Sequence, residues 1–370
     1  MLSLTLSFNI NIIMKAITWL YIVTFLLSLA GCARKNDVSI LVSHLDEEKL
    51  IASKVIQKDT LKYVDTLIYA KEFLVYQDSV LIVINNKHKD GYFVELYMLP
   101  SMEPITKLYK LGNGPNELLS AKVDLNKNQL IVNDYIKAQI AVVDIDSLLK
   151  NSDYLAVPIR HQAIGSPTAV PYKGKFLLEN PYSFIDEKAG IYQNAPRFIV
   201  TDGKVPYIER NKYQYYTRNV AVNGRIIINE EKDRIIYANM YKSTIEIYDM
   251  DLNKLKEVEG PFYLNPMYAV EGEEQYNSVS FKGYIPYAYL DYCVDNDYFY
   301  LTYIGDKLRE GQKMKELSCW IFKFNWDGDL IDCYPINYAL SISRSQQENA
   351  FYITTLSSDE TPLLIKVYEK

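Results

Sequence analysis

The feature that most constrains the fold is a unit that recurs six times along the chain. Each unit begins with turn-forming residues, followed by a short run of β-branched, aliphatic or aromatic residues. Such runs, bounded by turns, are typical of buried β-strands. The six stretches are residues 78–85, 126–133, 173–180, 232–239, 295–302 and 347–354. Their apolar runs, from Leu81 to Phe351, start about 54 residues apart on average, which indicates a repeat of several strands.

A second strand is predicted after each of these first strands. The second strands are expected at 93–99, 138–144, 197–201, 244–249, 319–324 and 363–368. An Asp-Gly pair at 327–328 then favours a hairpin into a third strand. The pattern predicts an all-β fold, a six-bladed β-propeller of four-stranded antiparallel blades. A pair of β-sandwiches is the alternative fold.

The last repeat is expected to lack its outer strand, because the chain stops at Lys370 soon after the last predicted strand. Residues 50–57 precede the first repeat and alternate roughly as a strand does. We predict that this N-terminal segment completes the last blade and closes the ring, which removes an open sheet edge.

The N-terminus has the pattern of a secretory signal. An apolar run at 16–30 follows Lys15 and is too short to span a bilayer. The run ends in Leu29-Ala30-Gly31-Cys32, which resembles the lipobox of bacterial lipoproteins. We therefore predict a signal peptide at 1–31, a lipid on Cys32, a linker at 32–48 and the propeller at 49–370. Either Met1 or Met14 is the start.

The residues after Cys32 predict the membrane in which the lipoprotein is anchored. Ala33 follows the cysteine, where an Asp would favour the inner membrane, and no acidic cluster comes next. These features favour the outer membrane, with the periplasmic face preferred over the cell surface. Several acyl groups on one cysteine would give a stable anchor, whereas a single chain is marginal.

Composition makes two kinds of site poor candidates. The net charge is −6 and no basic run occurs, which argues against nucleic acid as a partner. The three histidines lie far apart in the sequence, so a His-based zinc site is not expected. The 33 tyrosines suit strands and packing between blades. For Cys319 and Cys333, a disulfide and free buried thiols both remain open.

One short motif carries a family resemblance. The segment Leu111–Leu118 reads Leu-Gly-Asn-Gly-Pro-Asn-Glu-Leu. It resembles the G-x-G-P-x-E motif of TolB-like six-bladed β-propeller lipoproteins of Gram-negative, Bacteroidetes-type bacteria. Many members have Gly at the position of Asn116 and Phe at that of Leu118. The resemblance implies a propeller, a membrane anchor, and a motif that joins the outer strand of one blade to the inner strand of the next.

The residues of this motif indicate a tight turn rather than a phosphate loop. Gly112 and Gly114 are expected to adopt positive φ, and Pro115 keeps the residues before it out of a helix. Glu117 is expected to accept backbone N–H groups or to pair with a neighbour. Neither a Gly-Lys-Ser/Thr sequence nor G-x-G-x-x-G is present, so no nucleotide-binding loop is predicted.

Binding sites on such folds lie on the loops that connect strands and blades. We expect them on loops at 85–92, 180–196, 209–219, 260–280 and 304–318. The candidate ligand-binding residues are Tyr213, Tyr215, Tyr216 and Arg218, because aromatic and arginine side chains dominate binding hot spots and stack on sugars. The structural alternative for this stretch is a strand edge and a solvated turn.

No catalytic motif was found in the sequence, and no catalytic or metal-binding residue is predicted. The sequence therefore favours a binding or scaffolding module for an envelope protein or a glycan. The alternative is a calcium-dependent hydrolase or lyase with its site in the central channel, since oxygen ligands on inner strands suit Ca²⁺. No other cofactor is expected.

Overall fold

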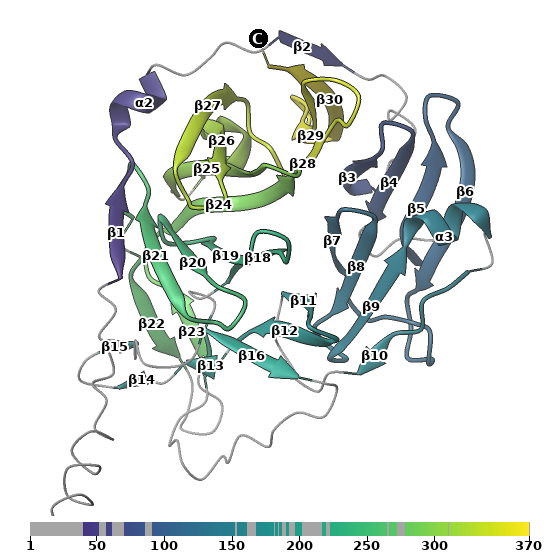
Figure 1. Ribbon diagram of the computed structural model, residues 1–370, viewed down its shortest axis with the longest axis horizontal. Coiled ribbons are helices and arrows are strands. Elements are labelled where there is room, and N and C mark those ends of the chain that lie inside the picture. Colours follow the sequence, from purple (N-terminus) through teal and green to yellow (C-terminus); the bar gives the residue numbers. More distant parts are fainter. Residues whose placement is uncertain are drawn as a thin grey trace, which may run out of the picture. The chain divides into compact units, whose positions relative to one another are not determined.

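Each of the six predicted apolar runs contains a β-strand in the computed structural model of the chain (Figure 1). The predicted second strands are also present, with ends that differ by a few residues. The structure describes residues 40–51, 57–60, 70–85, 91–151, 154–160, 168–180, 182–183, 185–186, 190–191, 197–201, 217–219, 223–264, 266–271, 278–309 and 311–369. Those from Leu41 onward belong to one unit.

The sheets are antiparallel meanders, so consecutive strands are hydrogen-bonded neighbours. The first sheet comprises β3 (Ala70–Tyr76), β4 (Val80–Asn85), β5 (Tyr92–Met98) and β6 (Glu103–Lys110). The second comprises β7 (Lys122–Asn126), β8 (Gln129–Asp134), β9 (Gln139–Asp144) and β10 (Ile159–Arg160). The third comprises β11 (Ala169–Tyr172), β12 (Lys175–Glu179) and β16 (Phe198–Thr201).

Three further sheets follow the same pattern. The fourth contains β18 (Gly224–Asn229), β19 (Arg234–Asn239), β20 (Thr244–Tyr248) and β21 (Lys254–Glu259). The fifth contains β24 (Ile285–Val294), β25 (Tyr298–Leu308), β26 (Cys319–Asn325) and β27 (Leu330–Ile336). The sixth contains β28 (Ser341–Arg344), β29 (Ala350–Leu356) and β30 (Pro362–Tyr368). We call the first strand of each of the six sheets its inner strand.

Two N-terminal strands join sheets that are distant in sequence. β1 (Leu41–His44) pairs in parallel with β21, and β2 (Gln57–Thr60) pairs antiparallel with β30. The expected strand at 50–57 is wrong at its start, because Leu50 belongs to helix α2 (Glu47–Ile51). The buried Leu50 side chain packs in a core cluster there, so the helix is fixed by tertiary packing.

Two small sheets were not predicted. One contains β13 (Tyr182–Ser183), β17 (Thr217–Asn219), β22 (Tyr268–Glu271) and β23 (Ser278–Phe281). The other contains β14 (Ile185–Asp186) and β15 (Gly190–Ile191). Both are built from segments that the sequence analysis treated as loops. The described residues also form helix α3 (Ile145–Lys150), which Asp144 caps, and the 3₁₀ turn η4 (Met314–Glu316).

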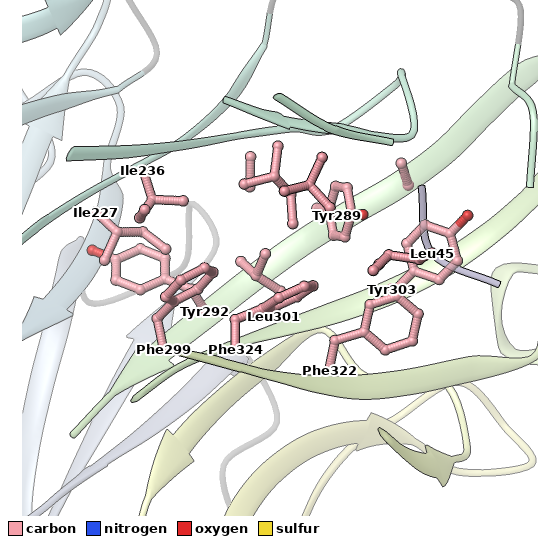
Figure 2. Close-up of a cluster of buried hydrophobic side chains, with 14 of the residues drawn as sticks. Leu45, Ile227, Ile236, Tyr289, Tyr292, Phe299, Leu301, Tyr303, Phe322 and Phe324 are labelled. Atoms are coloured by element: carbon pink, nitrogen blue, oxygen red, sulfur yellow. The ribbon is translucent and has the colours of Figure 1, made fainter. Parts of the chain in front are cut away.

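Aromatic side chains fill much of the core. Figure 2 shows the cluster in which Tyr289, Tyr303, Phe322 and Phe324 gather beside Leu45 from the N-terminal segment. The rings of Tyr303 and Phe322 are stacked with centroids 4.7 Å apart. Packing in strands therefore accounts for buried tyrosines of this kind.

The three cysteines of the described region are buried and free. Cys333 lies opposite Phe322 in the sheet register, whereas Cys319 lies opposite Ile336, so the two sulfurs do not form a cross-strand bridge. Among the described residues, no helix has the length and apolar character needed to cross a bilayer.

Candidate functional site: a cavity lined by inner strands

A cavity of about 710 Å³ lies where four inner strands end. Its walls come from β3, β7, β24 and β28 and from the turns that lead out of these strands. The volume falls within the range of small-ligand pockets, roughly 300–1,000 Å³. The cavity is thus lined by strands of four different sheets.

A buried arginine fastens three inner strands together beside this cavity. Arg225, on β18, donates from Nη1 to Oδ1 of Asp124 on β7 at 2.8 Å. Its Nη2 lies 3.2 Å from Oδ1 of Asp291 on β24, and its Nε donates to the carbonyl of Leu290 at 2.7 Å. Asp124 and Asp291 line the cavity, and all three charged residues are less than a tenth exposed.

The charged groups around this arginine shift one another's pKa values. Burial, together with the nearby carboxylates of Glu72 and Asp124, raises the pKa of Asp291 to about 7, although Arg225 opposes the rise. Burial disfavours the charge of Arg225, but Asp291 and Asp124 outweigh it and raise the arginine pKa. Asp124 and Asp291 therefore share one guanidinium.

A series of hydrogen bonds connects the neighbourhood of this cluster to the start of β18. Lys122, two residues before Asp124 on β7, donates to Oγ1 of Thr168 at 2.6 Å, and Thr168 donates to the carbonyl of Gly224 at 2.9 Å. Burial and Arg225 lower the pKa of Lys122 to about 8. Burial raises the pKa of the nearby Glu179 to about 7, although the hydrogen bond from Tyr237 opposes this.

Two charged side chains that line the cavity, Asp146 and Arg344, have partners within the protein. Asp146 accepts the Tyr76 hydroxyl hydrogen at 2.8 Å. Arg344 contacts Glu369 at 2.7 Å, and its guanidinium lies over the Phe351 ring at 4.6 Å from the centroid. These contacts fix the wall before any ligand binds.

The G-x-G-P-x-E motif connects β6 to β7, as the resemblance implied. Glu117 Oε2 accepts the Gly114 N–H at 2.8 Å. Lys137 Nζ donates to the carbonyls of Gly114 at 2.9 Å and Glu117 at 2.6 Å. The buried Leu118 closes the loop, since its carbonyl accepts the Gly112 N–H at 2.9 Å.

The expected role of the two glycines is wrong in one respect. Neither Gly112 nor Gly114 has positive φ. A Cβ on Gly112 would lie 2.1 Å from Glu117 Oε2, and one on Gly114 would lie 3.0 Å from the Glu117 carboxyl carbon. The glycines leave space for the folded-back Glu117 side chain, and Pro115 lies in the turn between them and Glu117.

The predicted ligand-binding residues are not brought to the cavity by the described structure. Tyr213, Tyr215 and Tyr216 lie outside the described residues, as does Cys32. Arg218 lies on β17, not on a loop, where its backbone pairs with Tyr182 and Ser278. Their role in ligand binding remains a prediction.

Sequence reasoning missed the cavity residues, because it looked at loops between the second and third strands and between blades. The cavity instead lies at the turns that follow inner strands. Glu72, Asp124, Arg225 and Asp291 are charged residues on the inner strands β3, β7, β18 and β24, and no common spacing marks them in the sequence.

A comparison with protein-family models decides the classification. The model described as TolB-like 6-blade propeller-like matches residues 52–340. The chain belongs to this family. No protein of curated function matches the sequence.

One solved structure has a similar fold. A DUF4221 family member from Bacteroides vulgatus is 11% identical, with a TM-score of 0.51, over 86% of this chain and 98% of its own. A Bacteroides fragilis protein described as exported is also 11% identical, with a TM-score of 0.46, over 90% of this chain and 100% of its own. The likeness to the DUF4221 protein concerns the fold alone and carries no activity.

Proposed function

We propose that the protein is a binding or scaffolding module of the cell envelope, for a protein or glycan ligand. The observation that carries this proposal is the preformed cavity, whose charged walls are held by Arg225 and by hydrogen bonds within the protein. Preorganised polar groups in a concave site are typical of ligand recognition. Cys32 would attach the module by lipid to the outer membrane, preferably on the periplasmic face.

We further propose that the six sheets are the blades of one six-bladed ring. The family match and the six recurring meanders support this architecture. β2 would close the ring, because it adds a fourth strand to the sheet formed by the last three strands. Deleting residues 57–60 should then lower the melting temperature of the whole unit in a single transition.

The partner can be identified on the native protein. Purification of the tagged lipoprotein from cross-linked, gently solubilised outer membranes, followed by mass spectrometry, should recover a stoichiometric envelope protein. A glycan array should be run in parallel. Capture of neither a protein nor a glycan would contradict a binding role.

The aromatic segment remains a second candidate contact. Replacement of Tyr213, Tyr215, Tyr216 and Arg218 by Ala should weaken capture without unfolding the protein. Tyr263→Ala is the matched control, because this tyrosine is 85% exposed on another connection. Unchanged capture by the fourfold variant would remove these residues from the site.

The alternative function, a calcium-dependent hydrolase or lyase, is favoured by one observation. Burial raises the pKa values of Asp291 and Glu179 to about 7, and acids tuned towards neutral pH occur at active sites. Within the described residues, no group of three His, Cys, Asp or Glu side chains is arranged to hold a metal ion. Elemental analysis and melting curves with and without chelator would separate the two functions: bound calcium and a lower melting temperature in chelator would favour the enzyme.

A further inference from the structure

Strand β1 carries two aliphatic side chains that the fold leaves in water. Leu41 is 62% exposed and Val42 is 52% exposed. β1 lies at the outer edge of the fourth sheet, beside β21, and no other described strand pairs with it (Figure 1). Because neighbouring residues of a strand point to opposite faces of the sheet, these two side chains make both sides of the edge apolar.

Other outer strands of the protein are protected in the usual way. β6 of the first sheet carries the exposed charged residues Glu103 and Lys107, and β27 of the fifth sheet carries Asp332 and the exposed Pro335. Natural sheets use charged residues and proline to keep their edges from binding other molecules, or they cover the edge. The start of β1 has neither protection, so we expect this edge to be covered.

A groove of about 310 Å³ lies against the start of β1. It is lined by Leu41, by aliphatic side chains of β20 and β21, and by two ion pairs. Arg234 contacts Asp327 at 2.8 Å, and Lys256 contacts Asp329 at 2.8 Å. Each cation of the groove is thus matched by an acid. A surface without net charge suits a zwitterionic partner better than an anionic or a cationic one.

The position of the proposed lipid indicates what covers this edge. Cys32 precedes Leu41 by nine residues in the sequence. Nine extended residues span at most about 30 Å, so a lipid on Cys32 would keep β1 within that distance of the bilayer. A contact that is linked to an anchor forms as an intramolecular step, at an effective concentration in the millimolar range. Two aliphatic side chains therefore suffice for binding that they could not achieve on a free protein.

We infer that the β1 edge docks on the zwitterionic surface of the bilayer that holds the lipid of Cys32. This inference rests on the proposed lipid anchor and specifies how the module lies on the membrane. Leu41 and Val42 would enter the boundary between headgroups and acyl chains, where water still reaches the outer backbone groups of β1. The module would then keep one orientation towards its partner instead of turning freely about its linker.

The test places a tryptophan on the edge and measures its contact with lipid. Full-length Leu41→Trp lipoprotein is reconstituted into phosphatidylcholine vesicles with or without bromine on the acyl chains, which quenches an indole that touches it. Bromine should lower the fluorescence added by the new tryptophan by about twofold or more. Val157→Trp is the matched control, because Val157 is 63% exposed before β10 of the second sheet. Its added fluorescence should be unchanged.

A second pair of variants tests whether the apolar edge itself makes the contact. Val42→Ser in the Leu41→Trp protein should reduce the quenching about twofold, because it removes apolar surface beside the reporter. Val157→Ser in the same protein removes the same side chain from an exposed position elsewhere and should leave the quenching unchanged. Quenching should also be equal at low and high salt, since the ion pairs of the groove leave no net charge to screen.

Mass spectrometry of the N-terminal peptide separates the two claims. If Cys32 is acylated, equal quenching of the two tryptophan variants, or no effect of Val42→Ser, would overturn the inference while the anchor stands. Quenching that is lost at high salt would overturn the zwitterionic surface. A Cys32 without acyl groups would contradict the proposed anchor and the inference with it, and the partner capture would still test the binding function separately.

Discussion

Arg225 and Arg197 both form ion pairs with carboxylates inside the protein, yet their surroundings differ in one respect. Arg197 binds Glu246 through two hydrogen bonds of 2.9 Å, and Lys254 lies 3.2 Å from the same carboxylate. Two cations thus contact Glu246, although Lys254 also contacts Glu257 at 2.5 Å. At Arg225, the carboxylates of Asp291, Asp124 and Glu72 all act on one guanidinium, and the buried Lys122 lies near two of them.

The pKa values record this difference. Although burial opposes it, Arg197 and Lys254 lower the pKa of Glu246 to about 2. Burial and neighbouring acids raise the pKa of Asp291 to about 7. The comparison teaches that Glu246 is held charged by two direct cationic partners, whereas Asp291 shares Arg225 with Asp124 and is more deeply buried, so its proton is retained to higher pH.

The largest effect expected from this comparison concerns the arginines themselves. Arg225→Met should cost about 3–5 kcal/mol of stability at neutral pH, because it leaves buried carboxylates without their cation. Arg197→Met should cost less, about 2–3 kcal/mol, since Lys254 still faces Glu246. Urea unfolding of both variants measures the difference. Equal costs would remove the distinction between the two sites.

Asp291→Asn should change the pH dependence of stability. The folded state holds the Asp291 proton up to about pH 7, whereas an unfolded aspartate releases it near the ordinary pKa of 3.8. Stability from this group is present at low pH and is lost as the pH rises from about 4 to about 7, by on the order of 4 kcal/mol. The asparagine variant should lack this decline in urea unfolding at pH 4.5 and 8. Parallel curves for the two proteins would contradict the raised pKa.

Glu246→Gln should show the opposite sign. The pKa of Glu246 is about 2 in the folded state, against an ordinary value of 4.5, so its stability is present above pH 4.5 and is lost as the pH falls towards 2. The variant should cost about 2 kcal/mol at pH 7, through the lost charged hydrogen bonds. As the pH falls from 4.5 towards 2, the melting temperatures of the variant and the original protein should converge. A constant gap across this range would argue against the depressed pKa.

The smallest effect is expected in the motif loop, which lies away from both arginines. Gly112→Ala should cost about 1–2 kcal/mol, because the added Cβ meets the Glu117 carboxylate. In a Glu117→Ala background the same change should cost much less. This double-mutant cycle by urea unfolding isolates the contact. Additive costs would show that Glu117 is not the obstacle.

The strands could be predicted because their signal is local. The runs at β4, β8 and β19 are apolar, short and bounded by turns, and each forms a buried strand. The start of the predicted N-terminal strand was misplaced, because Leu50 alternates as a strand residue would, yet tertiary packing holds it in a helix. The local sequence pattern around Leu50 does not show which tertiary contacts this residue will make.

The cavity could not be predicted in the same way. Glu72, Asp124, Arg225 and Asp291 are spread over more than two hundred positions and meet only when the sheets come together. No spacing rule joins them. The motif was recognised, but its glycines were assigned to positive φ, since a close approach to Glu117 is visible only in three dimensions.

The most direct test of the account of the Arg225 cluster is the titration of Asp291 by carbon-13 NMR of its carboxyl group. The Asp291→Asn variant assigns the resonance. We predict a midpoint near 7 in the unaltered protein, and a lower midpoint in Glu72→Gln, because Glu72 contributes to the rise. The same midpoint in both proteins, or one near 4 in the unaltered protein, would contradict the coupling of Asp291 to its buried neighbours.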